Sequence, residues 1–188
     1  NLEGRGTLLG AFKGEDKLLI ATQQGTLRAV APELSLHFDE TVIHLEQWIP
    51  KKPITAVYFD AEKERYFIKR FLIESVDKED SFIKEDSTLL YVGFDWLPIL
   101  EVHFEKPRGK EQPESLLINA NEFIAVKGYK ALGNQLTNKK VKAVELKEAL
   151  PYEMPKEEAI QDIEVELDDE ESDPETKKGD DSQITLDF

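Results

Sequence analysis

The stretch EDKLLIATQQGTLRAV, from Glu15 to Val30, gives the first indication of the fold of this chain. An apolar run from Leu18 to Ala21 leads into a Gln-Gln-Gly turn, and a second apolar stretch follows the turn. Short apolar or β-branched runs separated by glycine turns are typical of antiparallel strands. We therefore expect a β-hairpin here, with Gly25 as its turn glycine.

The same pattern continues along the chain as far as residue 146. Alternation is clearest in ILEVHFE, where Leu100, Val102 and Phe104 share one face of the expected strand. No stretch within 1–150 keeps a helical period over twelve residues, so the sequence predicts an all-β fold. The further strands that we expect are TLLGAF (7–12), TVIHLEQW (41–48), ITAVYFD (54–60), RYFIKRFLIES (65–75), TLLYVGFD (88–95), ILEVHFE (99–105), SLLINA (115–120), EFIAVKG (122–128) and KVKAVEL (140–146).

These strands repeat at a regular interval. TVIHLEQW returns as TLLYVGFD and again as KVKAVELK, and the steps from Thr41 to Thr88 and from Thr88 to Lys140 are 47 and 52 residues. Three strands with a returning fourth, at a spacing near 50, indicate the blades of a radial β architecture. The sequence predicts about three blades, each a four-stranded antiparallel sheet.

Charge divides the chain into a body and a tail. The net charge of the whole chain is -15, but residues 151–188 hold 15 acidic residues and 3 lysines, a net of -12. Residues 1–150 are nearly balanced, and within them lysines gather between 127 and 147. We therefore expect a β domain over 1–150 and an acidic, disordered tail over 151–188, because so polar a segment cannot bury enough apolar surface to fold.

Two units of the repeat resemble a known family. Thr22, Gly25 and Arg28 stand where the C-terminal domain of the A subunit of bacterial gyrase and topoisomerase IV has its blade motif. The last unit is similar, with Gly128 as its turn glycine and Lys130 as its basic residue. The resemblance covers most of residues 1–150 and implies a β-pinwheel, an arc of blades that exchange strands.

The last unit also departs from gyrase. Its loop ALGNQLTNKK contains Gly133 but no Arg-Gly-Gly run, which is the wrapping box of gyrase. The chain therefore resembles the A subunit of topoisomerase IV more than that of gyrase, although such a box could lie upstream of Asn1. A topoisomerase IV-like domain implies binding and bending of duplex DNA that guides relaxation and decatenation.

Basic side chains are the expected DNA contacts, because Lys and Arg bind phosphates without reading bases. The alternative is that they are ordinary solvated strand residues, and that the domain is a propeller-like protein-interaction module without a nucleic-acid role. The expected DNA-binding residues are Arg28, Lys69, Arg70, Lys127, Lys130, Lys139, Lys140 and Lys142.

No catalytic or metal-binding motif is expected in this chain. The histidines, His37, His44 and His103, lack the spacing of a metal site, and no cysteine is present. The resemblance implies that the catalytic tyrosine, ATP and Mg²⁺ belong to other parts of the enzyme. It implies two partners, the B subunit of the enzyme and a second copy of its A subunit. It also implies a bacterial cytoplasmic, nucleoid-associated location, and no apolar run is long enough to span a membrane.

The segment QITLDF brings apolar residues back after a long polar stretch. Gln183, Leu186 and Phe188 resemble the peptide that binds the bacterial sliding clamp, so the clamp is an expected partner. The alternative is that this segment pairs with its own domain as an edge strand.

Overall fold

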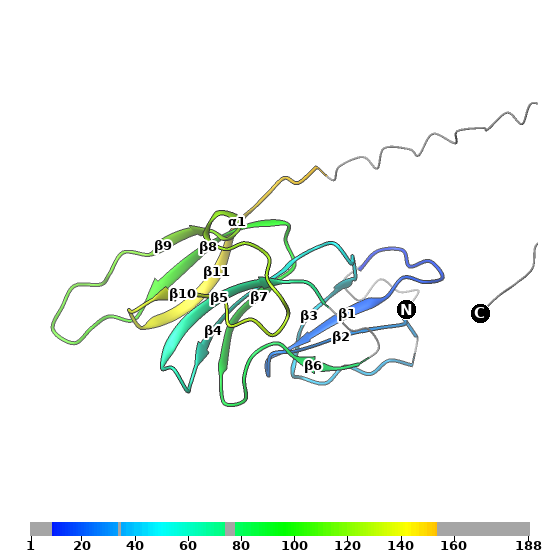
Figure 1. Cartoon of the computed structure of the whole chain (residues 1–188), viewed down its shortest axis with the longest axis horizontal. Helices are drawn as coiled ribbons and strands as arrows, with labels where there is room; N and C mark the ends of the chain where they lie inside the picture. Colours follow the sequence, from blue (N-terminus) through cyan, green and yellow to red (C-terminus); the bar gives the residue numbers. More distant parts are fainter. Residues whose placement is uncertain (1–8, 34, 74–77, 154–188) are drawn as a thin grey trace, which may run out of the picture. The chain divides into compact units, whose positions relative to one another are not determined.

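A computed structural model describes residues 9–33, 35–73 and 78–153, which form one compact unit ending at Glu153. Within these ranges every element is a strand except the short helix α1 (Ala120–Phe123) (Figure 1). The all-β prediction is confirmed. No helix of the described ranges is long and apolar enough to cross a membrane.

Sheet A has the strand order β3-β1-β2-β6. Its hairpin joins β1 (Leu18–Thr22) to β2 (Thr26–Val30) in antiparallel register. Gly25 has a φ of +75°, and its N–H donates to the carbonyl of Thr22 at 3.1 Å, so it is the turn glycine that the sequence predicts. The sheet is completed by β3 (Val42–Gln47) beside β1 and by β6 (Asp80–Ser81) beside β2.

Sheet B has the order β10-β5-β4-β7 and is the central sheet. Its hairpin joins β4 (Ile54–Asp60) to β5 (Arg65–Phe71), with β7 (Thr88–Gly93) beside β4 and β10 (Asn134–Thr137) beside β5. Almost every residue of β4 is buried, because both faces of this sheet are covered.

Sheet C has the order β11-β8-β9. The strand β8 (Leu97–Phe104) pairs with β9 (Leu116–Asn119) and with β11 (Val141–Leu150). The alternation predicted for β8 is confirmed, since Leu100, Val102 and Phe104 are buried and the residues between them are half-buried. This third sheet has three strands among the described residues, one fewer than we expected for a blade.

Strands are exchanged between the sheets. The fourth strand of sheet A, β6, comes from the chain after the hairpin of sheet B, and the fourth strand of sheet B, β10, comes from the chain after the hairpin of sheet C. Both pair antiparallel with the second strand of the earlier hairpin. Strand exchange of this kind makes the fold pinwheel-like, as predicted.

Two apolar clusters hold the sheets together. One joins sheets A and B through residues such as Leu27, Ala56 and Phe71, and the other joins sheets B and C through Val57, Ile68 and Leu100. Burying one of the larger of these side chains, such as Leu27 or Phe71, contributes roughly 1.5–3 kcal/mol. Because sheet B supplies residues to both clusters, its packing fixes the positions of its two neighbours.

Some expected strands are absent and one unexpected strand appears. Residues 9–12 form no strand, and EFIAVKG is replaced by α1 and an irregular segment in which Lys127 makes one isolated parallel bridge to Phe71. The reason is local, because the side chain of Asn119 accepts a hydrogen bond from the Asn121 N–H and so caps α1. The segment NQLT, expected as a loop, is strand β10.

The tail lies almost entirely outside the described residues. The expectations for a disordered segment and for a clamp-binding peptide at Gln183, Leu186 and Phe188 concern residues of which the structure gives no description.

Gly133 directly precedes β10 and approaches the backbone of β5 closely. Its φ is +91°, and a Cβ there would lie 2.2 Å from the carbonyl oxygen of Ile68 in the paired strand. We expect Gly133→Ala to lower the free energy of unfolding by about 2–4 kcal/mol, because strain and a backbone clash add. Gly109 is a matched control, since its φ is +73° but nothing lies within 4 Å of its added Cβ.

Urea denaturation of the two variants measures this difference. Gly109→Ala should cost about 1–2 kcal/mol, the cost of the left-handed conformation alone. Equal losses for the two variants would show that the approach of Gly133 to β5 is not a constraint on the fold.

Candidate nucleic-acid interface

Exposed basic side chains gather where three turns of sheets B and C meet. Two adjoining hollows lie there, and they share Glu105 and Lys140 in their walls. We call them together the basic cleft. Its charged residues are seven basic side chains (Lys63, Arg65, Lys106, Arg108, Lys110, Lys139 and Lys140) and three acidic ones (Glu64, Glu105 and Glu111), a net charge of +4.

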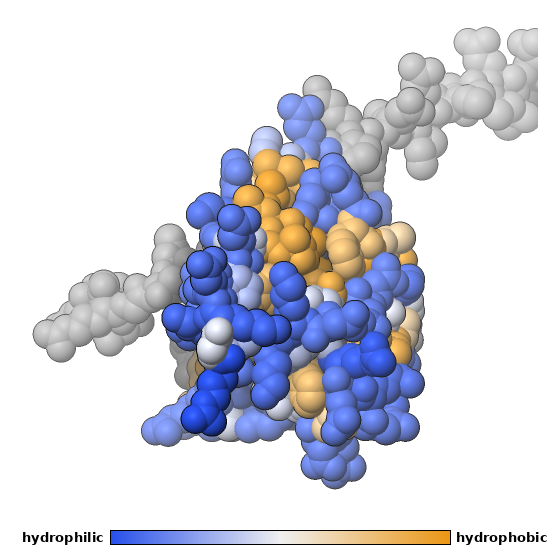
Figure 2. Space-filling view, turned by 90° about the vertical axis from the view of Figure 1, so that its left-hand side faces the viewer, coloured by the Kyte–Doolittle hydropathy of each residue, from blue (hydrophilic) through white to orange (hydrophobic). Residues whose placement is uncertain are grey.

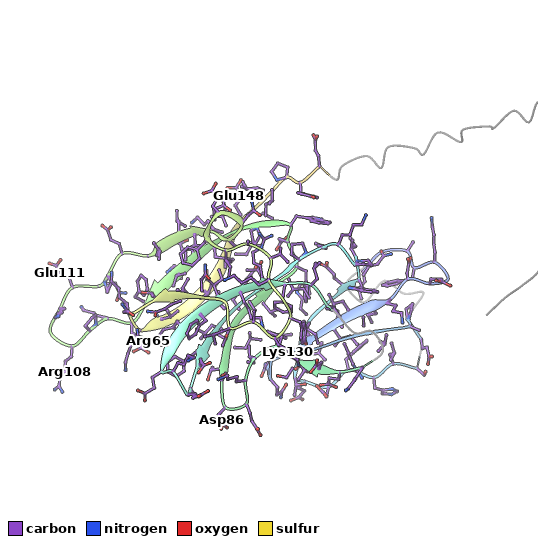
Figure 3. All side chains as sticks on the ribbon, viewed as in Figure 1. Arg65, Asp86, Arg108, Glu111, Lys130 and Glu148 are labelled. Atoms are coloured by element: carbon purple, nitrogen blue, oxygen red, sulfur yellow. The ribbon has the colours of Figure 1, made fainter. Side chains whose placement is uncertain are left out.

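Figure 3 shows Arg65, Arg108 and Glu111 at the same end of the molecule. All seven basic residues of the cleft are exposed. Among the residues that the structure describes, none of them forms an ion pair with an acidic side chain. The cleft therefore presents uncompensated positive charge to solvent, a suitable surface for an anion.

The β4–β5 turn supplies Lys63 and Arg65. The carboxylate of buried Asp60 accepts a hydrogen bond from the Lys63 N–H at 2.9 Å, which closes the turn. The Arg65 guanidinium donates to the side-chain oxygens of Gln135 and Asn138, both at 3.3 Å. These contacts hold the β4–β5 turn against the β10–β11 turn.

The β8–β9 loop and the β10–β11 turn supply the remaining five. The Glu105 N–H donates to the carbonyl of Lys140 at 2.9 Å, so the loop and the turn are joined at their bases. Within the turn, the Lys139 ammonium lies 5.1 Å from the centroid of the Phe104 ring. A cation–π contact of this kind holds the lysine stem while leaving the charge near the surface.

Two of the expected DNA-binding residues, Lys139 and Lys140, lie in this cleft. Lys142 is exposed two positions further on, on β11. Lys127 and Lys130 lie elsewhere and already have partners. The Lys127 ammonium donates to Asn134 Oδ1 at 2.9 Å, and the Lys130 ammonium pairs with Asp80 at 2.7 Å. Arg28 is half-buried on β2.

Lys69 and Arg70 correct the sequence-based expectation, because both are only 2% exposed. The Lys69 ammonium donates to the carbonyls of Phe82 and Tyr129, both at 2.7 Å. The Arg70 guanidinium donates to Asn121 Oδ1 and to the carbonyl of Trp96, also at 2.7 Å. Both side chains bind partners inside the protein, where no phosphate can reach them.

Five cleft residues, Lys63, Arg65, Lys106, Arg108 and Lys110, were not among the expected DNA contacts. The signal that could have found them is position in the repeat. The stretches DAEKER and EKPRGKEQP both connect the first and second strands of a hairpin, so both end at the same side of neighbouring blades. Local lysine density alone favoured 127–142 instead.

The glycines of the last unit have different structural roles. The carbonyl of Gly128 accepts from the Ala131 N–H at 3.0 Å, so Gly128 opens a turn over Tyr129 and Lys130. Gly133 approaches the backbone of β5, as described above. Neither glycine lies in the basic cleft.

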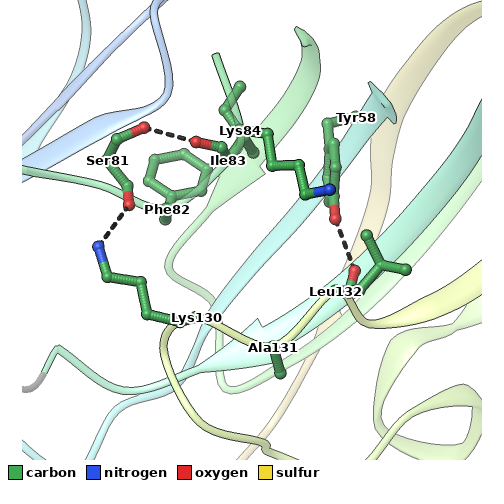
Figure 4. A pocket seen from close by; sticks show the side chains of 8 residues that line it. All are labelled: Tyr58, Ser81, Phe82, Ile83, Lys84, Lys130, Ala131 and Leu132. Carbon is green, nitrogen blue, oxygen red and sulfur yellow. Dashed lines mark hydrogen bonds between the residues drawn. The ribbon is translucent and has the colours of Figure 1, made fainter. Parts of the chain in front are cut away.

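We use the name return segments for residues 78–84, which contain β6, and residues 127–137, which contain β10. A smaller pocket between sheets A and B is lined by Tyr58 and by residues of both return segments (Figure 4). Its polar groups are engaged with the protein. Tyr58 donates to the carbonyl of Leu132 and Ser81 donates to that of Ile83, both at 2.6 Å, and Lys130 donates to the Ser81 carbonyl at 3.1 Å. These bonds indicate a structural role for the pocket. Over the described ranges, no group of three or more acidic, histidine or cysteine side chains could hold a metal ion.

The described domain is a pinwheel-like β domain of three sheets with basic side chains exposed at one end. The model of the family "Topoisomerase C-terminal domain, Bacteroidota" matches residues 1–149, and the chain belongs to this family. Searches of curated proteins and of solved structures gave no match.

Lys69 makes the stability of the domain depend on pH. Burial, with a smaller contribution from Lys130, lowers the pKa of its ammonium to about 8. In the unfolded chain the pKa returns to about 10.4, so between these values the native state binds fewer protons and stability rises with pH. We expect the wild-type free energy of unfolding to gain about 2 kcal/mol from this group between pH 7 and pH 9.5.

Lys69→Met should abolish this gain and lower stability at pH 7 by about 1–3 kcal/mol, because two buried carbonyls lose their donor. The control is Lys84→Met, which removes an exposed ammonium paired with Glu62 and should leave the free energy of unfolding almost unchanged, because exposed ion pairs contribute little. The series of urea denaturation experiments should end near pH 9.5. Burial raises the pKa of Tyr58 to about 12, so above pH 10 this residue lowers the stability of the native state as pH rises. The same pH dependence in wild type and Lys69→Met would contradict the role given to Lys69.

Proposed function

We propose that this chain is a DNA-binding C-terminal domain of the A subunit of a type IIA topoisomerase, closer to topoisomerase IV than to gyrase. The observation that carries the proposal is the basic cleft, with seven exposed basic groups that form no ion pair with the described acidic residues. Membership in the topoisomerase family supports it.

The cleft suits the phosphate backbone of duplex DNA. Its charges come from turns of two neighbouring blades, so a duplex lying across them meets basic groups along a line rather than at a point. Lysine and arginine bind phosphates with release of counterions and without base recognition. DNA that follows the rim from one blade to the next must bend, and the cost of bending varies with sequence.

The expected contacts outside the cleft have a secondary role in this proposal. Lys142 extends the cleft along β11. Lys127, Lys130 and Arg28 can meet phosphate only where the duplex continues past sheet B, and Lys130 must then leave Asp80 or share it. In this proposal, the basic residues of the turns contribute most of the free energy of DNA binding.

The other partners follow from the proposed enzyme. They are the B subunit and a second copy of the A subunit, in the bacterial cytoplasm. ATP and Mg²⁺ are bound elsewhere in the proposed enzyme. The clamp remains a proposed partner of Gln183, Leu186 and Phe188 on sequence similarity alone.

The double variant Lys139→Ala/Lys140→Ala tests the cleft. We expect it to weaken binding of a 30-base-pair duplex about tenfold at low salt. The slope of log K against log salt concentration should become less steep by about 2, since two phosphate contacts are lost. Fluorescence anisotropy over a series of salt concentrations measures both quantities.

The matched control is Lys13→Ala/Lys78→Ala, which removes two exposed lysines outside the cleft. It should leave the salt slope within about 0.5 of the wild-type value. Equal effects of the two double variants would place binding outside the cleft. No salt-dependent binding by the wild type would favour the protein-interaction module instead.

A further inference from the structure

Two basic side chains next to each other on β5 lie inside the protein. Figure 2 shows that hydrophilic residues make up most of the surface on one side of the domain, where charged groups are solvated. Lys69 and Arg70, by contrast, are both only 2% exposed. Because successive side chains of a strand point to opposite faces, Lys69 lies with Phe71 on the side of sheet A, and Arg70 lies with Ile68 on the side of sheet C.

The two buried charges differ in what can compensate them. Burial lowers the pKa of Lys69 to about 8, so this ammonium can lose its proton at a modest cost. Burial also lowers the pKa of Arg70, but a guanidinium stays protonated in proteins. Its two partners, Asn121 Oδ1 and the carbonyl of Trp96, are neutral, and no acidic side chain of the described residues forms an ion pair with it. Buried charges are normally paired, so a negative group is the partner that Arg70 requires.

Two polar atoms at this place are buried without a hydrogen-bond partner. They are the nitrogen Arg70 Nε and the hydroxyl oxygen of Thr55, a residue that is 0% exposed. Thr55 on β4 is directly opposite Arg70 on β5, and neighbouring strands are about 4.8 Å apart. Thr55 also shares the face of Val57, which belongs to the cluster between sheets B and C. The two unpaired groups are therefore adjacent, and both face sheet C.

A third hydrogen-bond donor lies in the same row. On its other side Thr55 is opposite Gly93 of β7, and a Cβ atom added to Gly93 would lie 2.1 Å from the hydroxyl oxygen of Tyr91. The Tyr91 hydroxyl therefore occupies the space above Gly93, next to Thr55, and the ring packs against the cluster between sheets B and C. Burial raises the pKa of Tyr91, so its hydroxyl keeps its proton and can donate.

We propose that Arg70, Thr55 and Tyr91 form a binding site for a chloride ion between sheets B and C. The Arg70 Nε–H and the two hydroxyls are the donors, and the chloride supplies the negative charge that the guanidinium lacks. Packed sheets are about 10 Å apart and side chains fill the space between them, so the site suits a monatomic anion rather than a phosphate. The site is separate from the basic cleft, which contains none of these three residues.

A bound chloride would strengthen a junction of several elements. Arg70 of β5 already contacts Asn121 of α1 and the Trp96 carbonyl, which directly precedes β8. An ion that binds only the native state stabilises it by mass action, so the stability of the domain should rise with chloride concentration.

Thermal unfolding of the full chain at constant ionic strength tests the proposal. Sodium chloride replaces sodium gluconate in steps at a fixed total concentration, so that only the anion changes. We expect the Tm of the wild type to rise by about 3–6 °C over the series. A Tm that does not change with chloride would overturn the proposal.

Variants of the hydroxyl groups separate the site from a general effect of the salt. Thr55→Val removes one donor with little change of shape and should abolish the rise in Tm, and Tyr91→Phe should reduce it. The matched control is Thr88→Val, the same change at an exposed position of β7, which should keep the full rise. An equal rise in the wild type and in Thr55→Val would show an effect of the salt alone and would overturn the proposal.

Anomalous diffraction from wild-type crystals in sodium bromide locates the ion itself. We expect an anomalous peak between Arg70 Nε and Thr55 Oγ1. Density at this position without an anomalous signal would identify a water molecule and overturn the proposal. A bromide peak without any dependence of the Tm on chloride would mean binding at crystal concentration only, and would also overturn it.

Discussion

Pairing of the second hairpin strand with a strand from later in the chain governs sheets A and B of this domain. Sheet A is completed only when the chain returns from sheet B as β6, and sheet B only when it returns from sheet C as β10. The return segments also contact each other, because Tyr129 donates to the carbonyl of Asp80 at 2.9 Å and Lys130 pairs with Asp80. Lys69 of β5 binds both segments through the carbonyls of Phe82 and Tyr129. Neither sheet A nor sheet B is therefore complete without a strand from later in the chain.

The hairpin turns take little part in packing the sheets together, so their side chains can be exposed and charged. The return segments and the two apolar clusters take up the faces of sheet B and the facing sides of its neighbours. The turns at Lys63, Arg108 and Lys139 contribute little to the clusters, so charge can gather there without burying an ion. The separation explains how one domain buries Lys69 and Arg70 as structural donors and still presents other basic groups to solvent.

The sequence predicted what depends on local pattern. The alternation of Leu100, Val102 and Phe104 predicted β8, and Gly25 predicted the first turn. Strand β10 was missed because Asn134 and Gln135 are polar and the strand exists only through its pairing with β5. Lys69 and Arg70 were expected at the surface because alternation cannot show that both faces of a central sheet are covered. The cleft was found only in part, since its side chains come from three turns that are distant in sequence.

The proposed binding surface for DNA consists of the turns of sheets B and C. Titration of the isotope-labelled domain with a short duplex, followed by backbone amide chemical shifts, tests it most directly. If the duplex lies across these turns, the largest chemical-shift changes fall on residues 61–65, 105–111 and 138–140, and they fade as salt is raised. Changes centred on Lys127 and Lys130, with the three turns unaffected, would contradict it.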